Sequence, residues 1–151
     1  MSRIDTAPTT STSLDGLRTN AFAAVTMLLI EFGLGLVVSL YAKLPSSDSR
    51  KGLFSAFGAA VASGPVALTL HALLGTLLLV TATAAVVRAV RVRRNAAIAI
   101  TSVAFLAIIL AWLAGTRFVG DADNGPSLVM GLATGVAILC YSAILFNVSD
   151  G

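Results

Sequence analysis

The stretch Ala21–Ala42 reads AFAAVTMLLIEFGLGLVVSLYA, and it decides the fold class of this chain. It is apolar apart from a few small polar residues and one charged side chain, Glu31. At about 1.5 Å per residue, a helix of roughly 20 residues matches the hydrocarbon layer of a membrane, which is about 30 Å thick. The stretch therefore predicts a membrane-spanning helix.

Three further stretches have the same length and character: Pro65–Val87, Ala96–Gly115 and Ser127–Phe146. Charged residues make up 11% of the chain, against about 25% in an average soluble domain. The sequence therefore predicts an all-α integral membrane protein, an antiparallel four-helix bundle. We expect helices at about 21–42, 65–90, 96–116 and 126–147, and a short interfacial helix at about 52–62.

The segment before the first span is rich in Ser and Thr. Such a composition is typical of a disordered segment, because it buries little apolar surface. We therefore expect a flexible cytoplasmic tail over residues 1–19 and a single four-span transmembrane domain over 20–148.

The basic residues predict how the chain lies in the membrane. The link between the second and third stretches reads RAVRVRRN and holds Arg88, Arg91, Arg93 and Arg94 without an acid. Clusters of this kind stay on the cytoplasmic side. We therefore expect a multi-pass protein of a prokaryotic cell membrane with both termini cytoplasmic. The net charge of +3 then reflects orientation, and we expect no nucleic acid partner.

Small residues predict where helices pack. Ser127, Gly131 and Gly135 follow one another at four-residue spacing, a pattern that lets a neighbouring backbone approach closely. Gly35 comes one turn after Glu31, and Gly75 one turn after His71. We expect these five residues to be helix-packing positions, and the bundle to continue into a homo-oligomer or a larger membrane complex. Three aromatic residues fit a belt at the outer interface: Tyr41, Trp112 and Phe118.

Glu31 and His71 are the carboxyl and imidazole groups inside the four stretches. An acid near the membrane centre costs about 3 kcal/mol to insert, so a function or a partner is expected for it. The depths of the two residues, counted from the ends of their stretches, differ by about 6 Å. If the first two helices are neighbours, the side chains can meet and share a proton. The sequence thus predicts an intramembrane polar site of Glu31 and His71.

Four roles for such a site remain open: structural glue, a proton or cation relay, binding of a lipid, quinone or other amphiphile, and haem binding. Haem b can be ligated through His71, but the chain has a single histidine, so a second ligand would have to be Met130 or come from elsewhere. We expect no cofactor, with haem b as the alternative.

The chain resembles small multidrug-resistance transporters in outline, since it has four apolar stretches and a glutamate, Glu31, in the first. It differs in having no Trp or Tyr around Glu31 within that stretch, and no glycine-rich kink in the third. The resemblance covers architecture and no specific motif.

Motifs of enzyme chemistry are missing from the sequence. There is no HExxH, no phosphate-binding glycine loop and no Cys/His pattern for a metal. We therefore expect a non-enzymatic protein with no catalytic and no metal-binding residues. The preferred interpretation is an accessory or structural subunit of a membrane complex. The alternatives are a small proton-coupled transporter and an amphiphile- or haem-binding bundle.

Overall fold

The computed structural model describes residues 9–41, 55, 57–58, 61–62, 64–121 and 124–147. Four helices account for most of them: α1 (Thr9–Tyr41), α3 (Val66–Val92), α4 (Asn95–Asp121) and α5 (Asn124–Asn147). No strand occurs among these residues. The predicted all-α four-helix architecture is confirmed.

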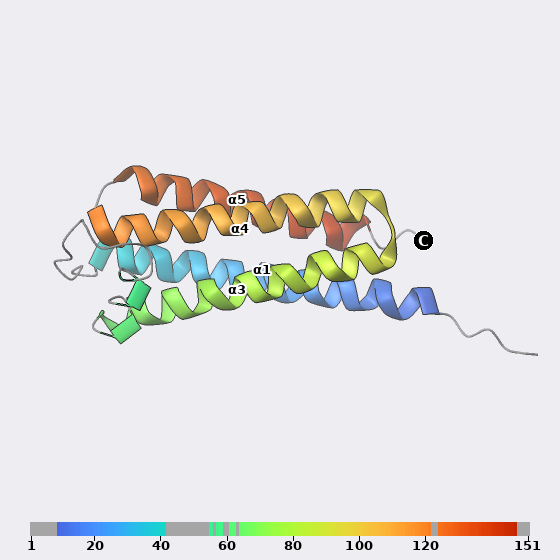
Figure 1. Cartoon of the computed structure of the whole chain (residues 1–151), viewed down its shortest axis with the longest axis horizontal. Helices are drawn as coiled ribbons and strands as arrows, with labels where there is room; N and C mark the ends of the chain where they lie inside the picture. Colours follow the sequence, from blue (N-terminus) through green and yellow to red (C-terminus); the bar gives the residue numbers. More distant parts are fainter. Residues whose placement is uncertain are drawn as a thin grey trace, which may run out of the picture.

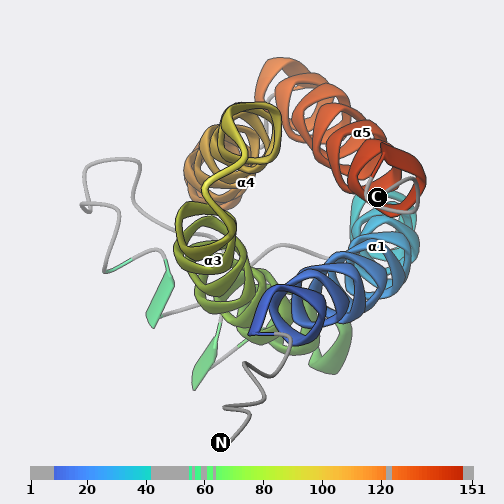
Figure 2. The same ribbon diagram turned by 90° about the vertical axis from the view of Figure 1, so that its right-hand side faces the viewer.

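The four helices form a ring in which each contacts two neighbours (Figure 2). α1 packs against α3 and α5, and α4 packs against the same two helices from the other side. Consecutive helices run in opposite directions (Figure 1). One end of the bundle carries the start of α1, the end of α5 and the α3–α4 turn with Arg93 and Arg94; we call it the basic end. The other is called the opposite end.

All four helices are long and apolar enough to cross a membrane, over Leu14–Tyr41, Val66–Val92, Asn95–Phe118 and Gly125–Phe146. Their outward faces carry large apolar side chains, and Leu40, Leu132 and Leu139 are each more than 60% exposed. In water such continuous apolar surface would drive association, whereas acyl chains solvate it. The chain is a polytopic membrane protein.

The first helix begins earlier than the sequence predicted. Residues 1–19 were expected to be a flexible tail, but α1 starts at Thr9. The physical reason is tertiary contact: Leu17 is fully buried, and the guanidinium of Arg88 donates a hydrogen bond to the carbonyl of Gly16. These contacts outweigh the weak helix preference of a Ser/Thr-rich segment. Residues 1–8 lie outside the described part.

The link between α3 and α4 is shorter than the loop expected from RAVRVRRN. Only Arg93 and Arg94 separate the two helices. Arg93 adopts the left-handed conformation with φ of 56°, and its N–H donates to the carbonyls of Ala89 and Val90. Left-handed residues of this kind commonly end a helix. The result is a tight helical hairpin.

The short helix predicted at about 52–62 is only partly described. Residues 55, 57, 58, 61 and 62 have helical backbone, and the other positions of that range lie outside the described residues. In Figure 1 the described pieces lie beside the start of α3, at the opposite end of the bundle.

The half of the bundle next to the basic end is closely packed. α3 contributes Ala82, Ala85 and Ala89, all fully buried, and these small residues bring its backbone close to its neighbours. Tyr141 from α5 and Thr101 from α4 are also fully buried there. The candidate site lies in the other half, where one glycine of each helix lines it: Gly35, Gly75, Gly115 and Gly131.

Candidate functional site

Glu31 and His71 lie on neighbouring antiparallel helices, one turn apart in height. Glu31 is level with Gly75: a Cβ at Gly75 would lie 2.9 Å from Glu31 Oε1. Reciprocally, a Cβ at Gly35 would lie 3.3 Å from His71 Cε1. Each glycine thus leaves room for the ionisable side chain of the other helix. Two of the predicted packing positions, Gly35 and Gly75, therefore border the polar pair.

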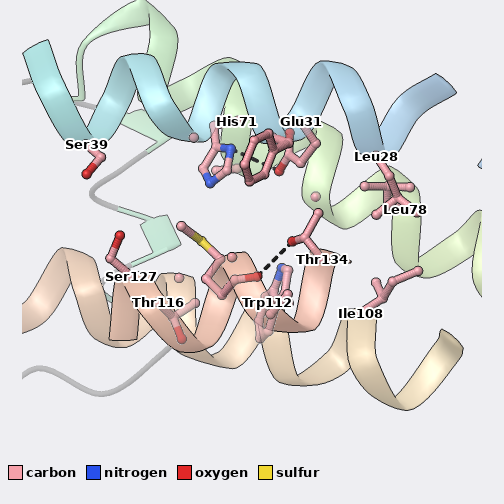
Figure 3. Close-up of a pocket in the computed structure, with 18 of the residues that line it drawn as sticks. Leu28, Glu31, Ser39, His71, Leu78, Ile108, Trp112, Thr116, Ser127 and Thr134 are labelled. Carbon is pink, nitrogen blue, oxygen red and sulfur yellow. Dashed lines mark hydrogen bonds and ion pairs between the residues drawn. The ribbon is translucent and has the colours of Figure 1, made fainter. Parts of the chain in front are cut away.

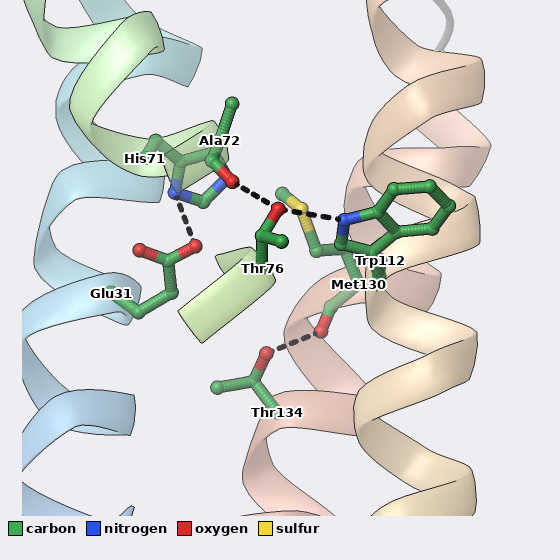
Figure 4. Close-up of polar contacts among 7 residues, drawn as sticks. All are labelled: Glu31, His71, Ala72, Thr76, Trp112, Met130 and Thr134. Atoms are coloured by element: carbon green, nitrogen blue, oxygen red, sulfur yellow. Dashed lines mark hydrogen bonds and ion pairs between the residues drawn. The ribbon is translucent and has the colours of Figure 1, made fainter. Parts of the chain in front are cut away.

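The structure places His71 Nδ1 3.1 Å from Glu31 Oε1 (Figure 4). This distance is that of an ion pair, although the atoms do not have the alignment of a hydrogen bond. Glu31 is 8% exposed, and its second oxygen, Oε2, is buried without a hydrogen-bond partner among the described residues. The site therefore holds a carboxyl group that its protein neighbours satisfy only in part.

The pair forms part of the wall of a cavity of about 150 Å³ in the half of the bundle away from the basic end. All four helices line it, and Phe57 from the segment between α1 and α3 lines it as well. The close-up shows the pair from α1 and α3 facing side chains from α4 and α5 across the cavity (Figure 3). We call this space the central cavity.

The central cavity has a polar and an apolar end. Ser39, Thr116 and Ser127 line it near the opposite end of the bundle (Figure 3). Leu28, Leu78 and Ile108 line its inner end, midway through the bundle. Ser39 and Leu28 are about 16 Å apart along α1, from the helical rise. The cavity therefore reaches from the end of the helices to roughly the middle of the membrane-spanning region.

Trp112 from α4 is an aromatic wall of the cavity. Its indole N–H donates to Thr76 Oγ1 at 3.4 Å, and that hydroxyl donates to the carbonyl of Ala72 at 2.9 Å (Figure 4). The Phe57 ring lies beside it, with centroids 5.9 Å apart. Because the indole N–H is already bonded to α3, the ring surface is the part of Trp112 left for a ligand.

Trp112 and the polar pair are close neighbours. The point that a Cβ at Gly75 would occupy lies 2.9 Å from Glu31 Oε1 and 3.9 Å from Trp112 Cδ1. The absence of a side chain at Gly75 therefore lets an acid from α1 and an indole from α4 approach the same spot. The aromatic residue beside Glu31 is therefore Trp112 of α4, and not a residue of the first span.

Met130 from α5 lines the cavity beside α4. Its sulfur would lie 3.4 Å from a Cβ at Gly115, so the thioether fills the space beside that glycine. Thr134 fixes the backbone there by donating to the carbonyl of Met130 at 2.8 Å (Figure 4). Met130 and His71 line the same cavity.

The predicted ridge on α5 has a different surrounding from the one expected. Ser127 and Gly131 line the central cavity. Apart from the adjoining residues and backbone of α5 itself, no atom of the described chain lies within 4 Å of a Cβ built at Gly131 or at Gly135. At Gly131 and Gly135, within the described residues, the ridge therefore brings no neighbouring backbone close. Its use as a contact between chains stays a prediction.

The predicted basic cluster lies at the basic end, where Arg88, Arg91, Arg93 and Arg94 are all exposed. Arg88 also donates to the carbonyl of Gly16, so it ties α3 to the start of α1. These arginines are far from the central cavity and do not contribute to its chemistry.

Three residues of the site were not predicted from the sequence: Trp112, Thr76 and Phe57. Trp112 was expected in an interfacial belt instead. The spacing of residues along α4 could have predicted that Trp112 faces the interior of the bundle. Its cavity-lining residues are Ile108, Ala111, Trp112, Gly115 and Thr116, which follow the spacing of one helical face. The inward position of Trp112 is therefore readable from its small neighbours on that face.

No known protein family, curated protein or solved structure shows significant similarity to this chain. No group of three or more His, Cys, Asp or Glu that could hold a metal ion occurs among the described residues. Fold and site together define a class: a four-span membrane bundle with an internal, mostly apolar cavity and one acid–imidazole pair in its wall.

Proposed function

We propose that this protein binds a small amphiphilic molecule in the central cavity, with the Glu31–His71 pair holding its polar head. The supporting observation is the combination of an unfilled space and a buried polar pair in the same wall. Ligand sites are typically concave and apolar, with a few polar groups that fix orientation. A purely structural contact between α1 and α3 needs the pair but has no use for the space.

The volume limits the ligand. A cavity of about 150 Å³ is comparable with one that admits a single benzene molecule. The central cavity therefore suits a ligand group of ring size. A porphyrin requires the helices to separate, so haem b ligated through His71 is a less favoured alternative.

The imidazole is the polar group presented to the ligand. Nδ1 is turned toward Glu31, and Nε2 is directed toward the cavity (Figure 3). When Nδ1 carries a proton, Nε2 accepts a hydrogen bond; when both nitrogens are protonated, Nε2 donates one. His71 can therefore hold a donor or an acceptor on the ligand.

The charge of the basic end supports an orientation. With Arg88, Arg91, Arg93 and Arg94 in the cytoplasm, both termini are cytoplasmic and the central cavity lies in the outer half of a cell membrane. The ligand then arrives from the outer leaflet or from the medium outside. A prokaryotic cell membrane remains our assignment of the compartment.

A role as a subunit of a larger complex is compatible with ligand binding. Gly135 is free of contacts within 4 Å of its Cβ position, and it lies next to the outward Leu132 and Leu139 on α5. Such a surface can accept another helix. Association with a second copy or with a larger membrane complex stays a prediction, which native mass spectrometry of the purified protein tests.

The chain's single tryptophan makes the binding test direct, because Trp112 lines the cavity. We would titrate the protein in lipid nanodiscs with 4-propylphenol, a ring with one hydroxyl group, and follow Trp112 emission. We expect a saturable change. Gly131→Leu should abolish it, because the added side chain starts in open space and extends into the cavity.

Gly135→Leu is the matched control. It makes the same change on the same helix, one turn away, at a position that does not line the cavity. It should leave the titration unchanged. Equal effects of the two variants, or no saturable change in the wild type, would count against a binding role.

A further inference from the structure

We propose that the basic end binds an anionic phospholipid, with the phosphate held by Arg88 and Arg91 of α3 and an acyl chain lying along the outward face of the same helix. This inference goes beyond the role of the central cavity, which lies in the other half of the bundle. Three features of the basic end carry it: its uncompensated positive charge, the place of the two arginines on α3, and the apolar side chains that lead up to them.

The basic end carries positive charge that the described protein does not neutralise. Arg88, Arg91, Arg93 and Arg94 are all exposed there. Asp15 is the one acid at this end among the described residues, and it forms no ion pair with any of the four. The guanidinium groups of Arg91, Arg93 and Arg94 make no hydrogen bond to the described residues. A partner that brings negative charge would therefore meet arginines whose donors are available.

Arg88 and Arg91 lie on one face of α3. They are three residues apart, and residues at this spacing are neighbours on a helix surface. Arg88 is held in place, because one of its N–H groups donates to the carbonyl of Gly16 in α1. A guanidinium has five N–H donors, so Arg88 keeps others for a ligand. Since the planar fork of arginine matches two oxygens of a phosphate, the two side chains can hold one phosphate between them.

The arginines end a stripe of lipid-facing side chains on α3. Its members are Leu73, Leu77, Val80 and Val87, and each is at least 45% exposed. Arg91 lies one turn beyond Val87 on the same face. From Leu77 to Val87 the stripe is about 15 Å long, which is half of the hydrocarbon thickness of a membrane. An acyl chain of one leaflet can therefore lie along the stripe while its phosphate reaches Arg91.

A phospholipid matches this arrangement better than a soluble phosphate does. The two arginines lie at the end of the apolar span Val66–Val92, at the level where lipid head groups begin. A soluble anion would use the charge alone, whereas a phospholipid uses the charge and the stripe together. Net negative charge is needed because each arginine near an anionic lipid surface contributes about fivefold in affinity. In the orientation proposed above, the lipid belongs to the inner leaflet.

The test compares two lipids with the same acyl chains. Palmitoyl-oleoyl phosphatidylglycerol is anionic, and palmitoyl-oleoyl phosphatidylcholine is zwitterionic. The full chain is freed of lipid in detergent and titrated with each, and native mass spectrometry counts the bound lipid. Two arginines at about fivefold each give a preference for phosphatidylglycerol of up to about 25-fold. We expect at least about fivefold, the contribution of one arginine, and a smaller preference overturns the proposal.

Arg91→Gln tests the residue at the end of the stripe. Its side chain makes no hydrogen bond or ion pair with the described residues, so the variant should fold, and unchanged binding of phosphatidylcholine shows that it does. We expect phosphatidylglycerol to bind about fivefold more weakly. Arg117→Gln is the matched control, because it also removes one exposed arginine, but at the opposite end of the bundle. It should leave the binding of phosphatidylglycerol unchanged, and equal effects of the two variants would overturn the proposal.

Glycerol phosphate distinguishes a lipid site from a site for soluble phosphate, since it has the head-group chemistry without an acyl chain. We expect a large excess of it to leave phosphatidylglycerol bound; displacement would mean that the stripe contributes nothing and would overturn the assignment to lipid. If Arg91→Gln cannot be purified, the preference of the wild type between the two lipids decides. None of these measurements involves 4-propylphenol, so this proposal and the binding role of the central cavity fail independently.

Discussion

Gly75→Ala is the sharpest probe of how the site is built. Its Cβ would lie 2.9 Å from Glu31 Oε1, whereas ordinary contacts are 3.4–4 Å. The carboxyl group must therefore retreat by about 0.5 Å or more, away from its place beside His71. Overpacking of this kind costs about 1–3 kcal/mol, and alanine returns about 1 kcal/mol through helix propensity. We expect a net loss of about 1 kcal/mol in the free energy of unfolding.

Gly135→Ala provides the comparison. No atom of another described helix lies within 4 Å of its Cβ position, so only the propensity gain applies, up to about 1 kcal/mol. The two variants should thus differ by about 2 kcal/mol. The free energy of unfolding is measured by titration with a denaturing detergent in mixed micelles, with Trp112 emission as the signal.

A double-mutant cycle tests whether the loss of stability in Gly75→Ala comes from contact with Glu31 Oε1. Glu31→Ala removes the atom that the new methyl group would meet, so adding Gly75→Ala in that background should cost nothing. The expected coupling energy is about 1–3 kcal/mol. Equal costs of Gly75→Ala in the two backgrounds would refute the reasoning, because the strain would then come from somewhere other than the carboxyl group.

Three further variants test the basic half by the same unfolding assay and by hydrogen exchange. Tyr141→Phe removes a buried hydroxyl that has no partner among the described residues, and should stabilise by about 1 kcal/mol; a loss of stability would show that the hydroxyl is bonded. Arg93→Gly relieves a left-handed residue with φ of 56° and should stabilise by about 1 kcal/mol; no gain would contradict that turn. Arg88→Ala removes the hydrogen bond to the Gly16 carbonyl and should speed amide exchange in the first turns of α1; unchanged exchange there would mean that the bond contributes nothing.

The fold could be predicted because lipid imposes a length. A helix that crosses the membrane needs about 20 apolar residues, and four such stretches are easily found. The helix ends could not be predicted in the same way, because outside the lipid they depend on contacts. α1 extends back to Thr9 through Leu17 and Arg88, and neither contact is visible in a composition rich in Ser and Thr.

The contact between Glu31 and His71 could be predicted from their depths, counted along the two predicted spans. The difference of about 6 Å between Glu31 and His71 equals one helical turn, which is the offset that the glycines of α1 and α3 establish. Trp112 could not be placed by the same counting. The third helix was expected to end near 116, where Trp112 would be one turn from the interface. In the structure α4 continues to Asp121, and Trp112 faces the cavity.

The surroundings of the glycines around the central cavity distinguish a purely structural site from a binding site. Gly35 and Gly75 have a packing reason, since side chains of the opposing helix fill the space beside them. Gly131 has none among the described residues: its Cβ position is open, and it borders a space of about 150 Å³. Empty space of that size costs up to about 4 kcal/mol, at about 24 cal/mol per Å³. A bundle held together only for its own stability would therefore gain from a larger residue at position 131. The Gly131→Leu variant that blocks the cavity should accordingly resist unfolding better than the wild type, because at this position stability and binding make opposite demands on the side chain.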